Sequence, residues 1–316
     1  MCSVDEITSL LNVNKDRRML SAVERKIEQF ITDLNDKEVS VLYAQLPDGK
    51  RLRAKLILKI AGNTLSAVKT AAIVEMIHAA SLLHDDVIDD AYTRRSKPSI
   101  NALYGNKTAI MLGDILYSKG FFELNDISPD VAKVISNAVV QLSLGELKDV
   151  SLSKAFNLDK EVYLEMIYQK TASLMEASAG AAALLAGKPK EAYMTYGRNL
   201  GIAFQMIDDL LDITVDAQTL GKPALHDFEE GKTTLPYIYL YEALGNEEQT
   251  KLRSLHAKRL SKEEELWIKM KMQEHQVIQK SYEEAKLLVV EAIELMNDRG
   301  EDALSSIGMQ MIEREF

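Results

Sequence analysis

Apolar and polar positions recur with a helical period through most of the chain. Between residues 20 and 34 the apolar side chains are three or four positions apart, at Leu20, Val23, Ile27, Phe30, Ile31 and Leu34. This spacing places them on one face of a helix. Alternating runs of Val, Ile and Thr are missing, whereas Ala, Leu, Glu, Lys and Met dominate, which favours helices over strands. The pattern predicts an all-α protein.

Breaks in this pattern divide the chain into predicted helices. A Pro-Asp-Gly turn at residues 47–49 ends the first of them, and the other prolines also fall at breaks. We expect one or two helices in 1–45, about four in 237–316, and single helices at 56–61, 67–90, 101–124, 129–150, 159–185 and 201–214. No linker or low-complexity run interrupts them, so residues 1–316 are expected to form one domain.

The apolar helix predicted at 67–90 ends in a run of aspartates. Asp85, Asp86 and Asp89 share one helix face, because positions i, i+1 and i+4 are neighbours. Carboxylates so placed repel by a few tenths of a kcal/mol even when exposed, so a cation is expected beside them. One such string alone is usually a solvated acidic helix end. Here a second apolar helix repeats the arrangement, at Asp208, Asp209 and Asp212.

Composition and charge narrow the class of protein. The 316 residues carry a net charge of −10, which argues against nucleic-acid binding as the main role. The single cysteine, Cys2, excludes an internal disulfide and is typical of a reducing compartment. The N-terminal residues lack the order of a signal peptide, and the most apolar windows, 71–83 and 174–186, are shorter than the roughly 20 residues of a spanning helix. A soluble, cytoplasmic protein is expected.

Cations are concentrated in the connections beside the predicted helices. Four of them lie within residues 50–55, directly after the glycine turn. The helix macrodipole disfavours cations at an N-terminus, and a bound anion would account for their position. The cations of interest are Lys50, Arg53, Arg94, Arg95, Lys170, Lys222 and Lys232.

Several standard sites are excluded by their spacing. Residues 231–233 resemble the tail of a P-loop, but His226 occupies the position of its first glycine. EF-hand and zinc-ligand spacings and the nucleophile elbow are also absent. Oxygen-only ligands select hard cations, and magnesium uses a few carboxylates, waters and phosphate oxygens. Carboxylates and cations together favour a phosphate-rich substrate held by Mg²⁺ and basic side chains, with departure of diphosphate as the chemistry.

Five segments resemble the trans-type (E-type) polyprenyl diphosphate synthases, most of all the long-chain, octaprenyl-type members. They are GKRLR (49–53), HAASLLHDDVIDDAYTRR (78–95), KTASL (170–174), FQMIDDLLD (204–212) and GKPALHDFEEGKTTLP (221–236). The resemblance covers nearly the whole chain. It implies an all-α, single-domain helical bundle of the isoprenoid synthase type, with the two aspartate motifs facing each other across a central cavity. It also implies a homodimer.

The resemblance assigns roles to individual residues. Magnesium would be coordinated by Asp85, Asp89 and Asp208, with Asp86, Asp209 and Asp212 as further or water-mediated ligands, Asp212 being counted in the metal set. The allylic diphosphate would be held by Arg94, Lys170, Thr171, Lys222 and Lys232, with Gln205 near them. Isopentenyl diphosphate would be held by Lys50, Arg53, His78 and Arg95, although a histidine in an apolar helix is often a core residue. Ionisation of the allylic diphosphate gives a carbocation, which the isopentenyl double bond attacks before a proton is lost.

The product length depends on the residues one helical turn, about 5.4 Å, before Asp85. These are Ala80 and Ser81, both small, and in the family small residues here go with long products. We therefore predict hexaprenyl or longer chains, near octaprenyl, grown from farnesyl diphosphate or a similar starter for quinone side chains. Phe121 or Phe122 would form the floor of the tunnel. Small residues would also allow close helix packing without any such gate.

The chain departs from the family at Ala54, Tyr92 and Ser96, where Pro, Asp and Gly are usual. This leaves open the shape of the loop after the first motif. The sequence also has three alternative interpretations. A class I terpene cyclase is disfavoured by the second aspartate motif and the second set of cations. A non-catalytic subunit of a heteromeric prenyl synthase typically lacks some of the aspartates, and a short-chain farnesyl or geranylgeranyl diphosphate synthase remains an alternative.

Overall fold

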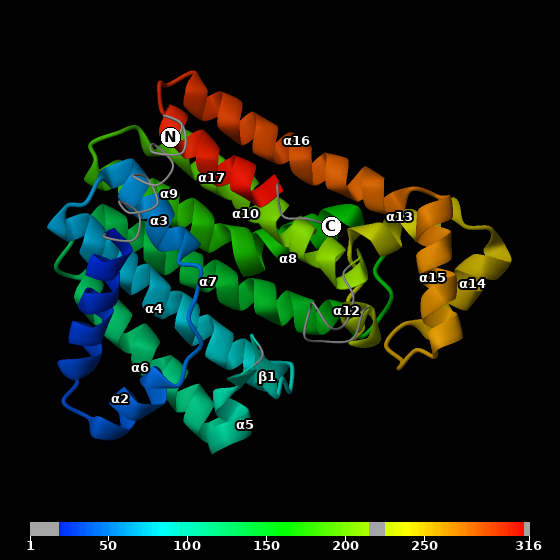
Figure 1. Cartoon of the computed structure of the whole chain (residues 1–316), viewed down its shortest axis with the longest axis horizontal. Helices are drawn as coiled ribbons and strands as arrows, with labels where there is room; N and C mark the ends of the chain where they lie inside the picture. The colour runs from blue at the N-terminus through cyan, green and yellow to red at the C-terminus, as the bar shows by residue number, and fades with distance from the viewer. Residues whose placement is uncertain (1–18, 96, 215–224, 313–316) are drawn as a thin grey trace, which may run out of the picture. The chain divides into compact units, whose positions relative to one another are not determined.

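The computed structural model describes residues 19–95, 97–214 and 225–312, and these are almost entirely helical (Figure 1). The prediction of an all-α protein is confirmed. Two compact units divide the chain: one holds the described residues up to Val139 with Ala177–Met194, and the other holds Val140–Glu176 and the described residues from Thr195 onward. The expectation of a single domain over 1–316 stays a prediction.

The first unit is organised around one long apolar helix, α4. Its elements are a helix at residues 19–32, α2 (Lys37–Ala44), α3 (Leu52–Ala61), α4 (Leu65–Ile88), β1 (Thr93–Arg94), β2 (Lys97–Pro98), α5 (Ile100–Tyr104), α6 (Asn106–Leu124), the first half of α7 (Pro129–Leu152), the later part of α9 (Ser173–Leu185) and the start of α10 (Lys190–Thr214). Helix α4 packs on α6 and on α3. Every residue from 71 to 77 is buried, as expected for a helix that, apart from Glu75, is apolar all round.

Helix α4 is also the one described helix that is long and apolar enough to cross a membrane. Most of its apolar window is buried inside the protein, against α3 and α6. The apolar composition of α4 is therefore that of a helix in the core of the first unit.

Glycines let α6 approach α4 closely. A Cβ at Gly113 would overlap the ring of His84, and a Cβ at Gly120 would lie 3.4 Å from Ile77 Cγ1. The stripe of α4 that faces α6 therefore includes Ile77 and His84. Ala80 lies three and four positions from them, on the same stripe, and is fully buried.

A short hairpin, which the sequence pattern did not predict, follows α4. Strands β1 and β2 pair antiparallel, and with two residues each they carry no alternation from which to predict them. Asp90 and Arg95 flank β1 with φ of 49° and 52°, in the left-handed region that non-glycine residues seldom occupy. Asn101 of α5 donates hydrogen bonds of 3.0 Å to the carbonyls of Asp86 and Ala91. The hairpin is thereby fastened to the end of α4.

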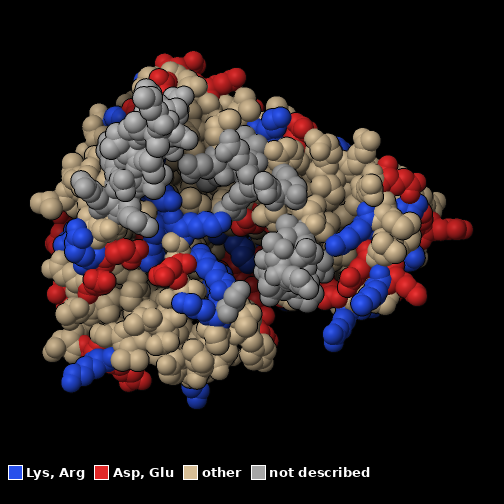
Figure 2. Space-filling view, viewed as in Figure 1, with Lys and Arg blue, Asp and Glu red and all other residues tan. Residues whose placement is uncertain are grey.

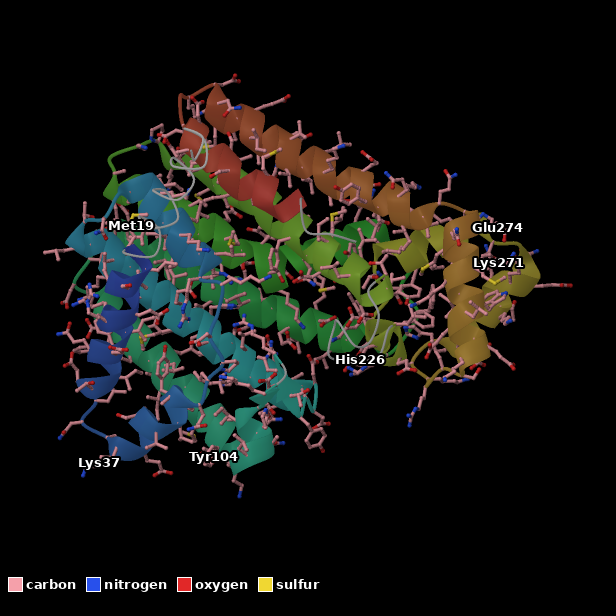
Figure 3. All side chains as sticks on the ribbon, in the orientation of Figure 1. Met19, Lys37, Tyr104, His226, Lys271 and Glu274 are labelled. Carbon is pink, nitrogen blue, oxygen red and sulfur yellow. The ribbon has the colours of Figure 1, made fainter. Side chains whose placement is uncertain are left out.

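The second unit contains the remaining helices. They are the second half of α7, α8 (Lys160–Ile167), the π-helix η1 (Tyr168–Ala172), the start of α9, most of α10, α12 (His226–Glu229), α13 (Leu235–Ala243), α14 (Asn246–Leu255), α15 (Lys262–Glu274), α16 (Val277–Asn297) and α17 (Asp302–Ile312). Helix α16 packs on α17 and α13. Lys271 of α15 pairs at 2.8 Å both with Glu274, one turn further along (Figure 3), and with Glu248 of α14.

Helix boundaries differ from the prediction where a local backbone feature interrupts the helix or shifts its start. The helix expected at 159–185 is three segments, because residues 168–172 form a wide π turn that a 3.6-residue pattern does not reveal. Gly105, with φ of 85°, separates α5 from α6 within the helix expected at 101–124. Helix α3 begins at Leu52, four residues earlier than expected.

Candidate active site

The first aspartate motif lies at the C-terminal end of α4. Asp85 and Asp89 are half-buried and one turn apart, with the Asp89 N–H donating to the Asp85 carbonyl at 2.8 Å. Asp86 is only 4% exposed, and its Oδ1 accepts from Arg94 Nε at 2.7 Å and pairs with Nη2 at 2.6 Å. Burial raises the pKa of Asp86, and the hydrogen bond from Arg94 opposes that effect. The charge of Asp89 also raises the pKa of Asp86, so Asp86 lies near Asp89 while Arg94 pairs with it. That the three carboxylates act together on a metal ion stays a prediction.

The cations of the first unit gather around His78. Burial is the largest cause that lowers the pKa of His78, and the charges of Arg53, Arg95, Arg94 and Arg51 lower it further. His78 is therefore neutral at pH 7 and stands in a strongly positive field. In Figure 2, Lys and Arg side chains gather over the region where Figure 1 draws α3. This arrangement favours an anionic ligand.

Arg53 has the property expected of a residue that binds an anion. Its Nε is buried and has no hydrogen-bond partner in the described part of the chain. Burial lowers the pKa of Arg53, against the effect of Glu75. A buried donor without an acceptor costs free energy, and a phosphate oxygen would satisfy it. Arg95 lies in the same field, and its Nη1 donates to the Asp48 carbonyl. Lys50 is exposed on the turn before α3.

Glu75, to which the sequence analysis gave no role, organises the start of α3. It is 3% exposed, and its Oε1 accepts the Ala54 N–H at 3.0 Å. Arg51 lies 3.4 Å from Glu75 Oε2 and donates to both carboxylate oxygens of Glu24, at 2.6 and 3.1 Å. A carboxylate at a helix N-terminus interacts favourably with the macrodipole. The anion inferred at this helix start is thus in part a side chain of the protein, signalled by a lone glutamate in an apolar helix.

In the second unit, Asp209 is the centre of a buried hydrogen-bond network. It is 5% exposed and accepts from the Tyr163 hydroxyl at 2.7 Å and from Gln205 Nε2 at 2.8 Å. Gln205 in turn accepts from the Thr171 hydroxyl at 2.7 Å. Burial first, and then the charge of Asp227, raise the pKa of Asp209 to about 8. Tyr163 was not predicted, because no spacing rule connects it to Asp209, 46 positions away.

The other two aspartates of this motif differ in burial. Asp212 is 2% exposed, and its Oδ2 accepts the N–H of Asp227 at 3.1 Å. Its carbonyl accepts the N–H of Leu225 at 3.0 Å, so Asp212 fastens the start of α12 to the end of α10. Asp208 is half-buried. It is the most accessible carboxylate of the three.

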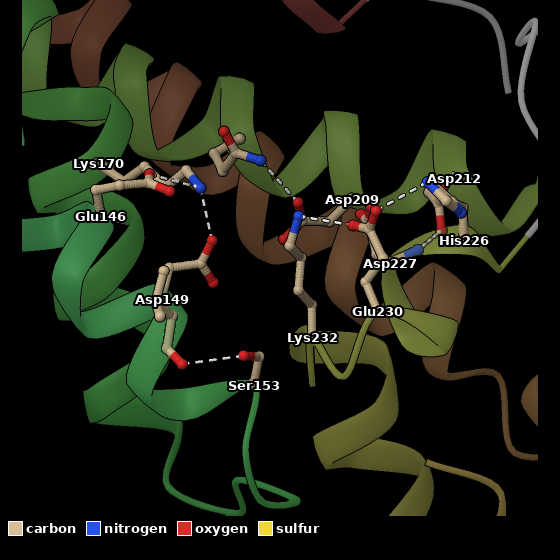
Figure 4. A network of polar contacts seen from close by, with 12 residues as sticks. Glu146, Asp149, Ser153, Lys170, Asp209, Asp212, His226, Asp227, Glu230 and Lys232 are labelled. Atoms are coloured by element: carbon tan, nitrogen blue, oxygen red, sulfur yellow. Dashed lines mark hydrogen bonds and ion pairs between the residues drawn. The ribbon is translucent and has the colours of Figure 1, made fainter. Parts of the chain in front are cut away.

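Lys170 lies on η1 and points toward α7. Its Nζ is 2.8 Å from Glu146 Oε2 and 2.6 Å from Asp149 Oδ2 (Figure 4). A Cβ at Gly145 would overlap the backbone of Lys170, so the glycine allows the two segments to approach. Wide π turns recur at functional sites. Glu146 and Asp149 were not among the predicted site residues, although they flank Lys170 directly.

Lys232 lies in the loop after α12. Its Nζ donates to Glu230 Oε2 at 2.9 Å, and its backbone N–H donates to the Asp227 carbonyl at 2.8 Å. Burial would raise the pKa of Glu230, but His226 and Lys232 lower it to about 2. Figure 4 shows these residues beside Asp209 and Asp212. Lys222, expected in the same set, lies outside the described residues.

The residues expected to set product length differ in exposure. Ala80 is fully buried, whereas Ser81 is half-buried and donates to the His78 carbonyl at 2.9 Å. Phe121 stacks on Tyr117 with ring centroids 6.4 Å apart. Phe122 is 65% exposed, so it is a poor floor for a tunnel within the chain. That part of the prediction now depends on Phe121.

The acidic residues fit a magnesium ion that arrives with phosphate. Among the described residues, no group of three or more acidic, His or Cys side chains is arranged to hold a metal ion by itself. Magnesium commonly needs only one or two carboxylates, because waters and substrate phosphates complete its octahedron. Asp85 and Asp89 in the first unit and Asp208 in the second offer half-buried carboxylate oxygens of this kind.

Known proteins are similar to this chain in both fold and sequence. A crystal structure of octaprenyl pyrophosphate synthase from Helicobacter pylori matches with a TM-score of 0.90 and 42% identity, covering 94% of this chain and 99% of that one. Octaprenyl diphosphate synthase from Escherichia coli is 38% identical over 221 residues, 67% of this chain and 68% of that protein. A short chain isoprenyl diphosphate synthase from Methanothermobacter thermautotrophicus is 33% identical over 253 residues, 76% and 78% of the two chains. Alignments with two solanesyl-diphosphate synthases from Oryza sativa span 54% and 45% of those proteins.

The all-α isoprenoid synthase fold and these relatives define a prenyltransferase. The sequence profile of the Polyprenyl synthetase family matches residues 37–272, and the chain belongs to this family. Membership removes the terpene cyclase from the candidate functions.

Proposed function

We propose that this enzyme condenses isopentenyl diphosphate repeatedly onto an allylic prenyl diphosphate, giving an all-trans polyprenyl diphosphate near octaprenyl length. The observation that carries the proposal is that each unit holds one aspartate motif and its own set of cations. Arg53 and Arg95 belong to the first unit, and Lys170 and Lys232 to the second. A reaction with two diphosphate substrates requires two such sets.

The second unit is assigned the allylic diphosphate. Lys170 and Lys232 are paired with carboxylates of their own unit, so they are held in place before a substrate arrives. A diphosphate brings more negative charge than any one carboxylate and competes for both ammonium groups. Magnesium would supply further positive charge to the leaving diphosphate. Its proposed ligands are Asp85 and Asp89 in the first unit, and Asp208 with Asp212 in the second.

The first unit is assigned isopentenyl diphosphate. Arg53 offers the buried Nε, with Lys50 and Arg95 as further cations and the neutral His78 as a hydrogen-bond partner. In the reaction the allylic C–O bond breaks and its electrons leave with diphosphate. The isopentenyl double bond supplies the electrons of the new C–C bond, and a proton is lost to the departing diphosphate. The resemblance of residues 49–53 and 78–95 to the motifs of the family is the basis for this assignment.

Separate phosphate sites predict opposite kinetic effects. Arg53→Ala or Lys50→Ala should raise KM for isopentenyl diphosphate about tenfold or more, because a charged hydrogen bond is worth about 1.5–3 kcal/mol. Lys170→Ala or Lys232→Ala should instead raise KM for the allylic substrate. Steady-state kinetics with each substrate varied in turn measures both. Lys55→Ala, on the same helix as Arg53, should change neither constant by more than twofold, and equal effects of all four changes on both substrates would refute the assignment.

Product length follows from the size of the side chains one turn before Asp85. Ser81→Phe should fill accessible space and shorten the product to farnesyl or geranylgeranyl length. Ala80→Tyr should shorten it as well, but Ala80 is fully buried on the stripe that faces α6. Overpacking there should lower the free energy of unfolding by about 1–3 kcal/mol. Chromatography of products from farnesyl and isopentenyl diphosphates measures chain length.

Ser40→Phe, on the exposed face of α2, is the control and should leave product length unchanged. A wild-type enzyme that stops at farnesyl diphosphate would support the short-chain function, which the relative from Methanothermobacter thermautotrophicus favours. If the purified chain by itself converts neither substrate, the result would support a non-catalytic subunit of a heteromeric prenyl synthase. Farnesyl diphosphate as starter, quinone side chains as destination and a cytoplasmic location stay predictions.

We also propose that two copies of the chain associate. Helix α7 exposes apolar side chains at Val140, Leu144, Leu147 and Val150, between 38% and 65% exposed, at spacings of three and four residues that form one stripe. A second copy of this helix is the proposed partner, because such a stripe is self-complementary across a two-fold axis. Sedimentation should give twice the chain mass for wild type. Leu147→Glu should give the monomer, whereas Lys148→Glu on the neighbouring position should not.

A further inference from the structure

His256, at the C-terminal end of α14, contacts the loop that carries Lys232. Its Nε2 lies 2.7 Å from the Gly231 carbonyl oxygen and 3.2 Å from the Thr233 hydroxyl. A carbonyl oxygen can only accept, so Nε2 carries the hydrogen and donates it to Gly231. The ring edge-packs on Phe156 and Phe228, with centroids 5.2 and 5.5 Å away. The imidazole is thus fixed in both orientation and tautomer.

The hydrogen bond from His256 orients one particular peptide group. The Gly231 carbonyl and the Lys232 N–H belong to the same planar peptide unit. His256 holds the carbonyl, and the Asp227 carbonyl accepts the N–H at 2.8 Å. Gly231 has φ of 88°, and a Cβ there would overlap the Ser153 carbonyl. The peptide group between Gly231 and Lys232 is therefore fixed by hydrogen bonds at both its carbonyl and its N–H.

We propose that His256 is a positioning residue for Lys232 and, through it, for the allylic diphosphate. This inference rests on the proposed function. It does not require His256 to touch the substrate. The imidazole adds no charge of its own at pH 7, because burial lowers its pKa against the effect of the Gly231 hydrogen bond. What it supplies is the direction of the 231–232 peptide.

The surrounding loop has other supports that do not depend on His256. Phe228 stacks on Tyr237 with centroids 4.3 Å apart, and the Asn157 N–H donates to the Thr233 hydroxyl at 3.3 Å. Loss of the imidazole donor should therefore leave the loop folded while the 231–232 peptide gains freedom to rotate. The consequence is expected in substrate binding rather than in overall stability.

Three substitutions of His256 separate the effect of its hydrogen-bond donor from the effect of its ring packing. His256→Phe keeps the aromatic packing but has no donor. His256→Asn is polar but too short for its amide to reach the Gly231 carbonyl, whereas the longer amide of His256→Gln can reach it. His275→Phe is the matched control, because His275 occupies the same C-cap position on α15.

We expect His256→Phe and His256→Asn to raise KM for the allylic diphosphate about threefold to tenfold, the effect of one neutral hydrogen bond. KM for isopentenyl diphosphate should change less than twofold, and His256→Gln should restore the wild-type value. In a Lys232→Ala background, His256→Phe should have little further effect, because the two residues act through one path. His275→Phe should leave both constants unchanged.

Equal rises in both KM values, failure of His256→Gln to restore binding, or additive effects with Lys232→Ala would each overturn the inference. If His256→Phe does not fold, His256→Asn and His256→Gln still decide it. Failure of the proposed function is distinguishable, because it would appear as no turnover by the wild-type enzyme or no effect of Lys232→Ala.

Discussion

Asp85→Asn and Asp208→Asn are each expected to lower kcat/KM at least a hundredfold, about 3 kcal/mol of transition-state stabilisation. Each change removes a charged, half-buried carboxylate that would hold an ion on the departing diphosphate. Asparagine keeps the size of the side chain, so loss of packing does not contribute. Initial rates with both diphosphates at saturating magnesium measure the effect.

Asp90→Asn is the control for this pair. Asp90 adjoins the same motif, is exposed and has φ of 49°, a conformation that asparagine adopts readily. It should keep near-wild-type activity. In EDTA, neither Asp85→Asn nor Asp208→Asn should melt below wild type, because each relieves a repulsion between carboxylates. Near-wild-type turnover by either variant would contradict the metal assignment.

Arg51→Ala is expected to lower the free energy of unfolding by about 3–5 kcal/mol, because it removes the guanidinium that forms an ion pair with the buried carboxylate of Glu75. Glu75 is 3% exposed, and Arg51 joins it to Glu24. Burial would lower the pKa of Arg51, but the hydrogen bond to Glu24 and the charge of Glu75 raise it. The guanidinium is therefore charged at every pH at which the protein is folded. Denaturant unfolding measures the loss.

Arg25→Ala removes a cation of the same kind from an exposed position next to Glu24. It should change the unfolding free energy by less than about 0.5 kcal/mol, as surface substitutions usually do. A similar small loss for Arg51→Ala would mean that Glu75 takes up a proton instead. Because Glu75 also accepts the Ala54 N–H, the destabilised Arg51 variant should bind isopentenyl diphosphate less well through a displaced Arg53.

The long helices were predictable because their burial follows from local composition. Residues 71–77 of α4 are apolar except for Glu75, and all of those side chains are buried. The departures have no such local signal. The hairpin has two residues in each strand, too few for a period. The start of α3 depends on Glu75, a partner from another helix.

The candidate site was predictable as a set of residue types but not as a set of contacts. Spacing placed Asp85, Asp86 and Asp89 on one face. It could not show that the chain turns at Asp90, which has a left-handed backbone, and brings Arg94 back to bind Asp86. Likewise, the hydroxyl of Tyr163 reaches Asp209 from another helix. Such contacts depend on tertiary packing, which no single-sequence pattern encodes.

The π turn at Tyr168–Ala172 fixes the helical phase of α9, the helix that continues directly from it. A wide turn contains one residue more than an α-helical turn needs, and one residue corresponds to about 100° of rotation in an α-helix. Deleting a single residue between Ile167 and Lys170 should therefore restore regular α-helical phase. It should also swing the lysine away from Glu146 and Asp149, although no charged residue would have been removed. The position of Lys170 therefore depends on the number of residues in this segment as much as on which residues they are. A one-residue deletion here should reduce activity more than most substitutions do.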